Sequence, residues 1–408
     1  MKSGETRSVN WRWAAAFIAL AALAESVLLG IRNYWLFVAS NGHVISADYS
    51  IFRFASVLFW RGDWATLFDP ALFIAAHARF DDAPPVIAAF PYPPSGVWFI
   101  LPLAALPNFP GLFLWLALTF AAFAWAICRR HGRWPAAALA LLLAPGSLIN
   151  ISYGQNGFLA AALLCGGLLL LEESPLLAGL LIGLLSFKPQ LGLLLPFVLI
   201  AGGHYRALIA AAITTAVLLL ASLWLFGTSG WMEYISGTMA MQRSTLQSAT
   251  GAMVMTMPSV LVAGRMLGLP LAVDYGLQGA AGLLAVGGAV WAFRRRSVAL
   301  PVKAAVVMVG AFLASPYFST SDLCILAAAQ VILLSRYRAL SPMEYALHAL
   351  IWVLPMLTAA LGPAHIPLGS MILLAFFGLL LKRLASEENT ASPGARLAAP
   401  LPADRAAP

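Results

Sequence analysis

The stretch GLQGAAGLLAVGGAVWAF, residues 276–293, contains no charged side chain and is followed at once by Arg294-Arg295-Arg296. A helix of about 20 apolar residues matches the roughly 30 Å hydrocarbon core of a bilayer. A basic cluster at the end of such a run is typical of the cytosolic side of a membrane protein. This stretch therefore predicts a membrane-spanning helix whose carboxyl end lies in the cytosol.

Similar apolar runs recur along the chain, at residues 14–30, 111–128, 207–226 and 371–381. Of the 408 residues, 61% are hydrophobic and only 10% are charged, whereas a soluble protein carries about 25% charged residues. The net charge of +8 comes from short basic clusters between the apolar runs, not from a stripe that would bind nucleic acid. We therefore expect an all-α polytopic membrane protein with about twelve transmembrane helices.

The basic clusters also predict the topology, because they place both ends of the chain in the cytosol. The first helix, at residues 13–38, is expected to remain uncleaved. A first extracytoplasmic loop follows at residues 39–95, with amphipathic helices on the bilayer surface. A second large extracytoplasmic loop is expected at residues 228–270. Residues 96–106 are too short to span the bilayer and are followed by prolines, which favours a kinked or re-entrant segment.

The transmembrane domain is thus expected to cover residues 1–384, and the Ala/Pro-rich residues 385–408 should form a disordered cytoplasmic tail. The three cysteines lie in apolar segments without ligand spacing, so neither a disulfide nor a zinc site is indicated. The sequence contains no DxD, Walker A, HExxH or GxSxG motif, which weighs against nucleotide-sugar, ATP and metalloprotease chemistry. We expect no metal and no cofactor.

The first predicted loop carries a carboxylate, Asp48, and a guanidinium, Arg53. Asp48 is suited to cap the amino end of a helix, a role that Asp fills well. An N-cap carboxylate at the outer leaflet can also face a cleft, so the two roles are compatible. Further along, Tyr92 lies in the run FPYPP at residues 90–94. These prolines predict a rigid, extended return to the membrane.

Three more polar groups interrupt the apolar segments. Gln155 and Asn156 lie between glycines, and their amides suit sugar hydroxyls, although a helix-turn-helix loop explains them equally well. Lys188 is the only lysine between residues 174 and 203. A charge at that depth is costly and indicates a functional site by default, unless the ammonium snorkels to the membrane surface. Asp322 follows a serine-rich loop, where it can cap the next helix.

In this combination and order, the motifs resemble glycosyltransferase family 87, the group related to polyprenyl-phosphate-mannose-dependent α-mannosyltransferases. The resemblance covers about residues 10–385. It implies a GT-C membrane fold and a lipid-phosphate sugar donor, used on the extracytoplasmic side with inversion at the anomeric carbon. Asp48 matches the family's catalytic aspartate. The residues that match its other recurrent motifs, and so would bind the donor phosphate or sugar, are Tyr92, Gln155, Asn156, Lys188 and Gln190.

The last loop departs from the pattern, since some relatives have a histidine near the position of Ser321-Asp322. Asp322 is therefore a candidate for a second catalytic or acceptor-binding residue. The chemistry also fits without the resemblance. Transfer from a polyprenyl phosphate to a hydroxyl needs one carboxylate base, which Asp48 can be. It also needs cations for the departing phosphate, for which Lys188 is suited, with Arg53 or Arg243 in reserve.

We therefore predict an integral membrane hexosyltransferase, with mannose as the expected sugar. It would lie in the inner (plasma) membrane with its active site on the extracytoplasmic side. Its partners would be a polyprenyl-phosphate sugar donor, a lipid or glycan acceptor and the bilayer. Two alternatives stay open: a transporter or flippase of lipid-linked saccharides, and a non-catalytic membrane subunit of an envelope-assembly complex. Transporters often have related halves and midplane sites, which this sequence does not indicate.

Overall fold

A computed structural model of the chain describes residues 47–80, 89–129, 134–248, 251–337 and 340–390. The predicted first helix, residues 13–38, and most of the predicted tail lie outside these ranges. Within the described ranges, all regular secondary structure is helical, as the sequence predicts.

The elements of the first part of the chain are α2 (Ala47–Arg61), α3 (Trp64–Phe68), α4 (Pro70–His77), η1 (Pro94–Phe99), η2 (Leu103–Ala105), α5 (Asn108–Cys128), α6 (Trp134–Leu143), α7 (Pro145–Tyr153), α8 (Gly157–Leu169), α9 (Pro175–Leu184), η3 (Leu185–Phe187) and η4 (Pro189–Gly192). Those of the second part are α10 (Leu195–Ala201), α11 (Tyr205–Glu233), η5 (Tyr234–Met239), α12 (Ala240–Ser248), α13 (Ala252–Met255), α14 (Val260–Met266), α15 (Leu271–Arg294), α16 (Leu300–Ala314), η6 (Thr320–Leu323), α17 (Cys324–Leu334), α18 (Pro342–Leu361), η7 (Gly362–Ala364) and α19 (Leu368–Thr390). The η elements are 3-10 turns, except for η5, which is a π-helix.

Several of these helices are long and apolar enough to cross a membrane, which makes the chain a multi-pass membrane protein. Five meet this description among the described residues: α5, the continuous run from α11 to α12, α15, α18 and α19. A sixth span arises if α6 and α7, which meet at a bend of 62°, are counted together. Other apolar helices, such as α8 and α16, are shorter. The total of about twelve spans therefore stays a prediction.

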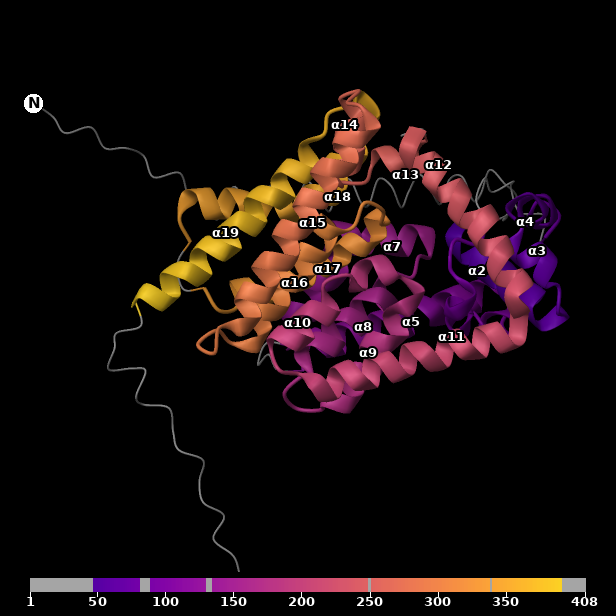
Figure 1. The fold of residues 1–408 in the computed structure, drawn as a ribbon, viewed down its shortest axis with the longest axis horizontal. Helices are drawn as coiled ribbons and strands as arrows, with labels where there is room; N and C mark the ends of the chain where they lie inside the picture. Colours follow the sequence, from indigo (N-terminus) through magenta and orange to yellow (C-terminus); the bar gives the residue numbers. More distant parts are fainter. Residues whose placement is uncertain (1–46, 81–88, 130–133, 249–250, 338–339, 391–408) are drawn as a thin grey trace, which may run out of the picture.

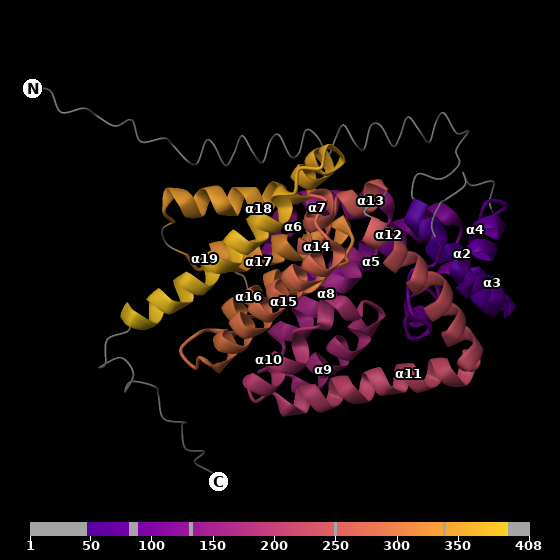
Figure 2. The same ribbon diagram turned by 45° about the horizontal axis from the view of Figure 1, so that its top comes forward.

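The centre of the bundle is formed by α8 and α16. Every residue of α8 except Leu159 is buried, and so is most of α16. A helix that is apolar on all sides is stable when other helices surround it. In contrast, α11 runs along the outside of the body (Figure 2), and its Trp224 is 86% exposed. Such an apolar surface is costly in water, so this face of α11 is suited to contact lipid.

The helices of the first loop, α2, α3 and α4, gather at one end of the molecule (Figure 1). Asp63 and Asp69 cap α3 and α4, because the side chain of each accepts a backbone N–H from the first turn. Tyr49 and Phe52 of α2 are buried inside the protein. The helices predicted for this loop are thus present, and the apolar face of α2 packs inside the protein; the place of α2 on the bilayer surface stays a prediction.

Three other segments refine the predicted topology. Residues 96–106 form the tight turns η1 and η2 rather than a spanning helix, in line with the kinked segment expected there. Residues 228–270 are mostly helical. α11 bends at Gly227, which has φ of +68°, and the chain then continues through η5 into α12. α19 continues to Thr390, since Ala385, Glu387 and Glu388 at the start of the predicted tail favour helix.

Candidate active site

Lys188 lies at a break between two helical turns, η3 and η4, within an apolar segment. Pro189 causes the break, because a proline disfavours helical backbone at the residue before it. Lys188 accordingly has φ of −124° and ψ of 68°. Its side chain is only 3% exposed, and its Nζ lies 2.6 Å from Oδ1 of Asp322. This burial and pairing rule out the alternative of a lysine that snorkels to the surface.

Asp322 lies fully buried in the turn η6. Its second oxygen, Oδ2, accepts the backbone N–H of Ser319 at 3.2 Å and completes a capping box with that residue. Asp322 therefore takes part in capping the turn η6 from its third position, and it does not cap the following helix α17, which is the role predicted from the sequence; the ion pair with Lys188 comes in addition. Because both carboxylate oxygens are engaged, Asp322 is poorly suited to accept a proton from a substrate.

Asp48 is the second residue of α2 and lies in its first turn, where the positive end of the helix dipole favours a carboxylate. Burial raises the pKa of Asp48 to about 6, although a hydrogen bond from Gln155 and the charge of Lys188 both act to lower it. A carboxyl group with a pKa close to neutrality is suited to exchange protons at physiological pH. Asp48 and Lys188 therefore belong to one electrostatic cluster.

The loop between α7 and α8 is held in place by two glycines. Gly154 ends α7 with φ of +62°, a left-handed conformation that glycine adopts without steric cost. The N–H of Gly157 donates to Oδ1 of Asn150 at 2.7 Å. A β-carbon on Gly157 would collide with the carbonyl oxygen of Ser321. Glycine at this position therefore allows α8 to begin directly against the loop that carries Asp322.

Tyr92 connects the other members of the cluster. The centre of its ring lies 5.9 Å from Nζ of Lys188. Burial raises the pKa of the Tyr92 hydroxyl well above its usual value, and so do the carboxylates of Asp322 and Asp48, while the side chain of Asn156 acts to lower it. The hydroxyl is therefore neutral at physiological pH and lies near both carboxylates.

The carboxamide of Asn156 is fully buried and lies close enough to the Tyr92 hydroxyl to lower its pKa, yet neither its oxygen nor its nitrogen makes a hydrogen bond of good geometry among the described residues. Leaving a buried polar group unsatisfied costs about 1–3 kcal/mol. The neighbouring Gln155 is better satisfied, because its side-chain oxygen accepts the Asn156 N–H at 3.2 Å while its amide donates to Asp48. Asn156 is thus the residue of this cluster most in need of an external polar partner.

Two residues at this site were not singled out from the sequence. Burial raises the pKa of Tyr317 to about 12, with further contributions from Asp322 and Asp48, so its hydroxyl lies close to both carboxylates. Tyr317 belongs to the same polar loop as Asp322. Its place in that loop is the one feature of the sequence that could have identified it. Asn150 accepts the N–H of Gly157 and so orients that residue. The sequence did not mark Asn150 as part of the site, because it lies within a predicted helix.

Arg53 makes structural contacts. Its Nε donates to the carbonyl oxygen of Leu106 at 3.2 Å, and its guanidinium lies 5.3 Å from the centre of the Phe80 ring. These contacts hold α2 against the end of the turn η2 and against Phe80, the last residue of the first described range. They give Arg53 a packing role that its sequence position did not reveal.

The remaining predicted residues lie at the edge of the cluster. Gln190 is partly buried in η4 and makes no side-chain hydrogen bond with the described residues. Arg243, the reserve cation, is exposed on α12. Its neighbour Gln242 donates to the carbonyl oxygen of Pro91 at 2.9 Å. α12 therefore contacts the segment that carries the Tyr92 ring.

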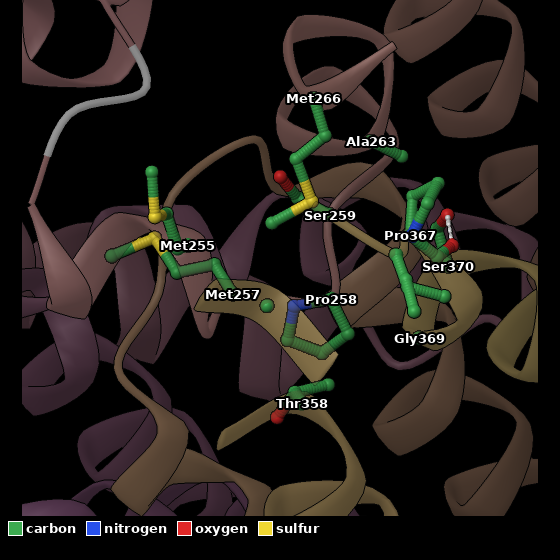
Figure 3. Close-up of a pocket in the computed structure, with 12 residues that line it drawn as sticks. Met255, Met257, Pro258, Ser259, Ala263, Met266, Thr358, Pro367, Gly369 and Ser370 are labelled. Carbon is green, nitrogen blue, oxygen red and sulfur yellow. Dashed lines mark hydrogen bonds between the residues drawn. The ribbon is translucent and has the colours of Figure 1, made fainter. Parts of the chain in front are cut away.

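A separate cavity, shown in Figure 3, lies between α14 and the adjoining ends of α18 and α19. It is lined by Met255, Met257 and Met266 together with proline and small or uncharged residues. Its volume of about 10 Å³ is enough for at most one water molecule. No charged side chain lines it, so it offers no acid, base or phosphate-binding group. The cluster around Asp48 and Lys188 is the better candidate for chemistry.

That cluster combines a carboxyl group that can accept a proton, a buried ammonium, neutral tyrosine hydroxyls and carboxamides. Among the described residues, no group of three or more His, Cys, Asp and Glu side chains could hold a metal ion. The arrangement can deprotonate a hydroxyl at Asp48 and hold an anion beside Lys188.

Comparison with known proteins gives one match. The sequence model of glycosyltransferase family 87 matches residues 90–316, more than half of the chain. The matched range contains the Tyr92 segment, the loop between α7 and α8, and Lys188, whereas Asp48 lies before it and Asp322 after it. No curated protein and no solved structure matches the chain significantly.

Proposed function

The chain belongs to glycosyltransferase family 87, and from this premise we propose that it transfers a hexose, specifically mannose, from a polyprenyl-phosphate donor to a hydroxyl of a lipid or glycan acceptor. Family membership and several spanning helices make it a membrane glycosyltransferase. The donor, sugar, acceptor and mechanism are the content of the proposal. So are a GT-C fold and an active site on the extracytoplasmic side of the inner membrane.

The observation that carries the proposal is the meeting of the half-buried Asp48 and the buried Lys188 in one electrostatic cluster. The two residues come from segments far apart in the sequence. A glycosyltransferase that uses a lipid-phosphate donor needs a base for the acceptor hydroxyl and a cation for the leaving phosphate. Asp48, with its raised pKa, suits the first role, and Lys188 suits the second.

In the proposed reaction, the carboxylate of Asp48 accepts the proton of the acceptor hydroxyl as the hydroxyl oxygen attacks the anomeric carbon. The new carbon–oxygen bond forms on the face opposite the phosphate. The bond between the anomeric carbon and the phosphate oxygen breaks, and the polyprenyl phosphate leaves with the electron pair. This single displacement inverts the anomeric configuration and requires one carboxylate, whereas a double displacement requires a second residue as nucleophile.

Lys188 would stabilise the negative charge that develops on the departing phosphate. An ammonium has three N–H donors, and in Lys188 one of them is directed at Asp322. The other two are available to phosphate oxygens. Asp322 then acts as a positioning residue that holds the ammonium, instead of serving as the second catalytic residue considered from the sequence.

The donor sugar would lie against the loop between α7 and α8. The unpartnered carboxamide of Asn156 can both donate and accept hydrogen bonds with sugar hydroxyls. The neutral hydroxyl of Tyr92 adds a further donor. Gln155 would orient Asp48 through their hydrogen bond, and Gln190 would contact the donor from the edge of the site.

The proposal is tested with the purified protein in bilayers, supplied with radiolabelled polyprenyl-phosphate mannose or glucose and an acceptor extract. We expect label to pass from the mannose donor to product. Asp48→Asn should reduce transfer by about 10²–10⁴-fold, the usual contribution of a general base. Asp69→Asn is the matched control, because it makes the same change at the N-cap of α4, where Asn caps about as well as Asp.

Other outcomes would separate the alternatives. Consumption of the glucose donor alone would contradict the choice of mannose and leave the mechanism standing. Transfer at the wild-type rate by Asp48→Asn would contradict the role of Asp48. Movement of labelled lipid across the bilayer without its consumption would identify a transporter or flippase. Intact envelope assembly in cells that carry Asp48→Asn would favour a non-catalytic subunit.

A further inference from the structure

Three central helices connect the candidate active site to a second region of the protein. α8 begins beside Asn156, α16 ends at the loop that leads to Asp322, and α17 begins two residues after Asp322. At their other ends, α8, α16 and α17 border a cavity of about 1140 Å³. A helix of 11 to 15 residues, the length of these three, extends about 20 Å. The cavity therefore lies at the opposite end of the bundle from the candidate active site.

The walls of this cavity are largely apolar, while several charged groups lie along it. The apolar lining residues are Ile127, Ala136, Ala137, Leu169, Val298, Leu300, Val331, Ile332 and Leu334. The charged lining residues are the cations Arg296, Lys303 and Arg336 and the single acid Glu172. The cavity thus combines an apolar surface with an excess of positive charge.

Two of the three cations are available to a ligand. Lys303 is partly buried and lies close enough to Glu172 for their charges to interact. Arg296 and Arg336 are both exposed, and neither makes an ion pair with the described residues. A guanidinium presents a planar fork of donors that matches the oxygens of a phosphate group.

The amino end of α16 adds to the positive potential. It lies in the cavity wall at Leu300, and the N–H groups of Val302 and Lys303 in its first turn donate to the carbonyl oxygen of Ala299. The positive end of a helix dipole favours a nearby anion. On its own this is a weak effect, but it reinforces the two arginines.

We propose that this cavity binds an anionic phospholipid of the leaflet opposite the candidate active site. The phosphate of the headgroup would contact Arg296 and Arg336, and an acyl chain would lie along the apolar wall. Charge complementarity selects an anionic ligand, and the apolar lining selects a lipid over a free phosphate. Basic pockets between transmembrane helices are suited to lipid headgroups of this kind. The proposal does not depend on the reaction that the protein catalyses.

The test measures the melting temperature of the detergent-purified full chain as lipid is added. The probes are phosphatidylglycerol, phosphatidylcholine and, as a soluble headgroup analogue, glycerol phosphate. A ligand that binds the folded state raises the melting temperature progressively with its concentration, and the rise begins near the dissociation constant. We expect phosphatidylglycerol to do so at lower concentration than phosphatidylcholine, and glycerol phosphate to have little effect.

The double variant Arg296→Gln/Arg336→Gln should weaken the effect of phosphatidylglycerol about tenfold or more, since it removes two charge-assisted contacts. Arg206→Gln is the matched control, because Arg206 is exposed at the start of α11 and does not line the cavity. Equal stabilisation by both phospholipids would overturn the proposal. So would an equal loss in the Arg206 variant, or full stabilisation by glycerol phosphate alone.

Discussion

The ammonium of Lys188 lies 2.6 Å from the carboxylate of Asp322, and both side chains are almost completely buried. The two residues are 134 positions apart in the sequence, so this ion pair fixes the η3–η4 break against the turn η6. Removing one member of a buried ion pair leaves the other charge without compensation, which is strongly destabilising. A loss of activity in either single variant could therefore result from unfolding alone.

A double-mutant cycle separates the two effects. Lys188→Met and Asp322→Asn should each lower stability by roughly 3–5 kcal/mol, because each leaves a lone buried charge. The double variant Lys188→Met/Asp322→Asn removes both charges, so much of the stability should return. Transfer activity should not return, because no cation is left for the departing phosphate. Unfolding in denaturant and sugar transfer are measured for all four proteins.

Recovery of activity together with stability in the double variant would mean that Lys188 acts only through the fold. Additive losses of stability would contradict the ion pair itself, since residues in direct contact are expected to show coupling. Arg243→Gln is a useful comparison, because Arg243 is the exposed reserve cation on α12. It should leave both stability and transfer close to wild type.

The unpartnered carboxamide of Asn156 leads to a second prediction. Asn156→Leu replaces a buried carboxamide that makes no hydrogen bond of good geometry among the described residues, although it lies near the Tyr92 hydroxyl, so the melting temperature should stay close to that of the wild type. If the carboxamide binds the donor sugar, the KM for the donor should nevertheless increase, by roughly tenfold for one or two lost hydrogen bonds.

Asn150→Leu is the matched control for this substitution. The side-chain oxygen of Asn150 accepts the N–H of Gly157, so its loss should lower the melting temperature. An Asn156→Leu protein with an unchanged donor KM would assign Asn156 to the fold alone. A protein with a lower melting temperature would show that the carboxamide has partners in the folded state.

Much of this arrangement was predictable from residue types and spacing. Lys188 was recognisable because a lysine in an apolar segment needs a reason to be there. Asp322 was recognisable as a cap because a serine precedes it by three positions. The pairing of these two residues was not predictable, because it depends on how α8, α16 and the two short turns pack. Contacts between distant segments leave no periodic pattern in the sequence.

Other contacts are not visible in the sequence either. Arg53 is predicted to serve the donor because it is a cation near Asp48, and its hydrogen bond to Leu106 is formed by backbone packing that no motif reveals. The pattern of α2 predicts an amphipathic helix on the bilayer surface, and the structure adds that its apolar face, including Phe52, is buried inside the protein. Amphipathicity indicates that one face is buried and does not distinguish protein from lipid as the neighbour.

The topology can be tested with single cysteines, because the three native cysteines are buried. Ala65 is exposed on α3, in the predicted first extracytoplasmic loop that also carries Asp48, and Ser297 is exposed beside the arginine cluster. If the candidate site is extracytoplasmic, Ala65→Cys should react with an impermeant thiol reagent added to intact cells. Ser297→Cys should react only after the membrane is opened. The reverse pattern would contradict the proposed orientation.

The pH dependence of transfer tests the base most directly. Burial raises the pKa of Asp48 to about 6, and a base must be ionised to act. kcat/KM should therefore rise about tenfold per pH unit below this pKa and level off above it. Stability should change in the opposite sense. The pKa of the folded state is raised above that of the unfolded state, so the stability contributed at low pH is lost as the pH rises through about 6.

The hydrogen bond from Gln155 acts to lower the pKa of Asp48. Gln155→Leu removes this bond and should move the acidic limb of the pH–rate profile to higher pH. Gln242→Leu is the control, because Gln242 donates to the carbonyl of Pro91 and should leave the limb unchanged. Because activity and stability depend on pH in opposite directions, a gain in folded protein cannot account for the rising limb. A rate that falls as the pH rises through 6, or a limb that does not move in Gln155→Leu, would exclude Asp48 as the base that Gln155 tunes.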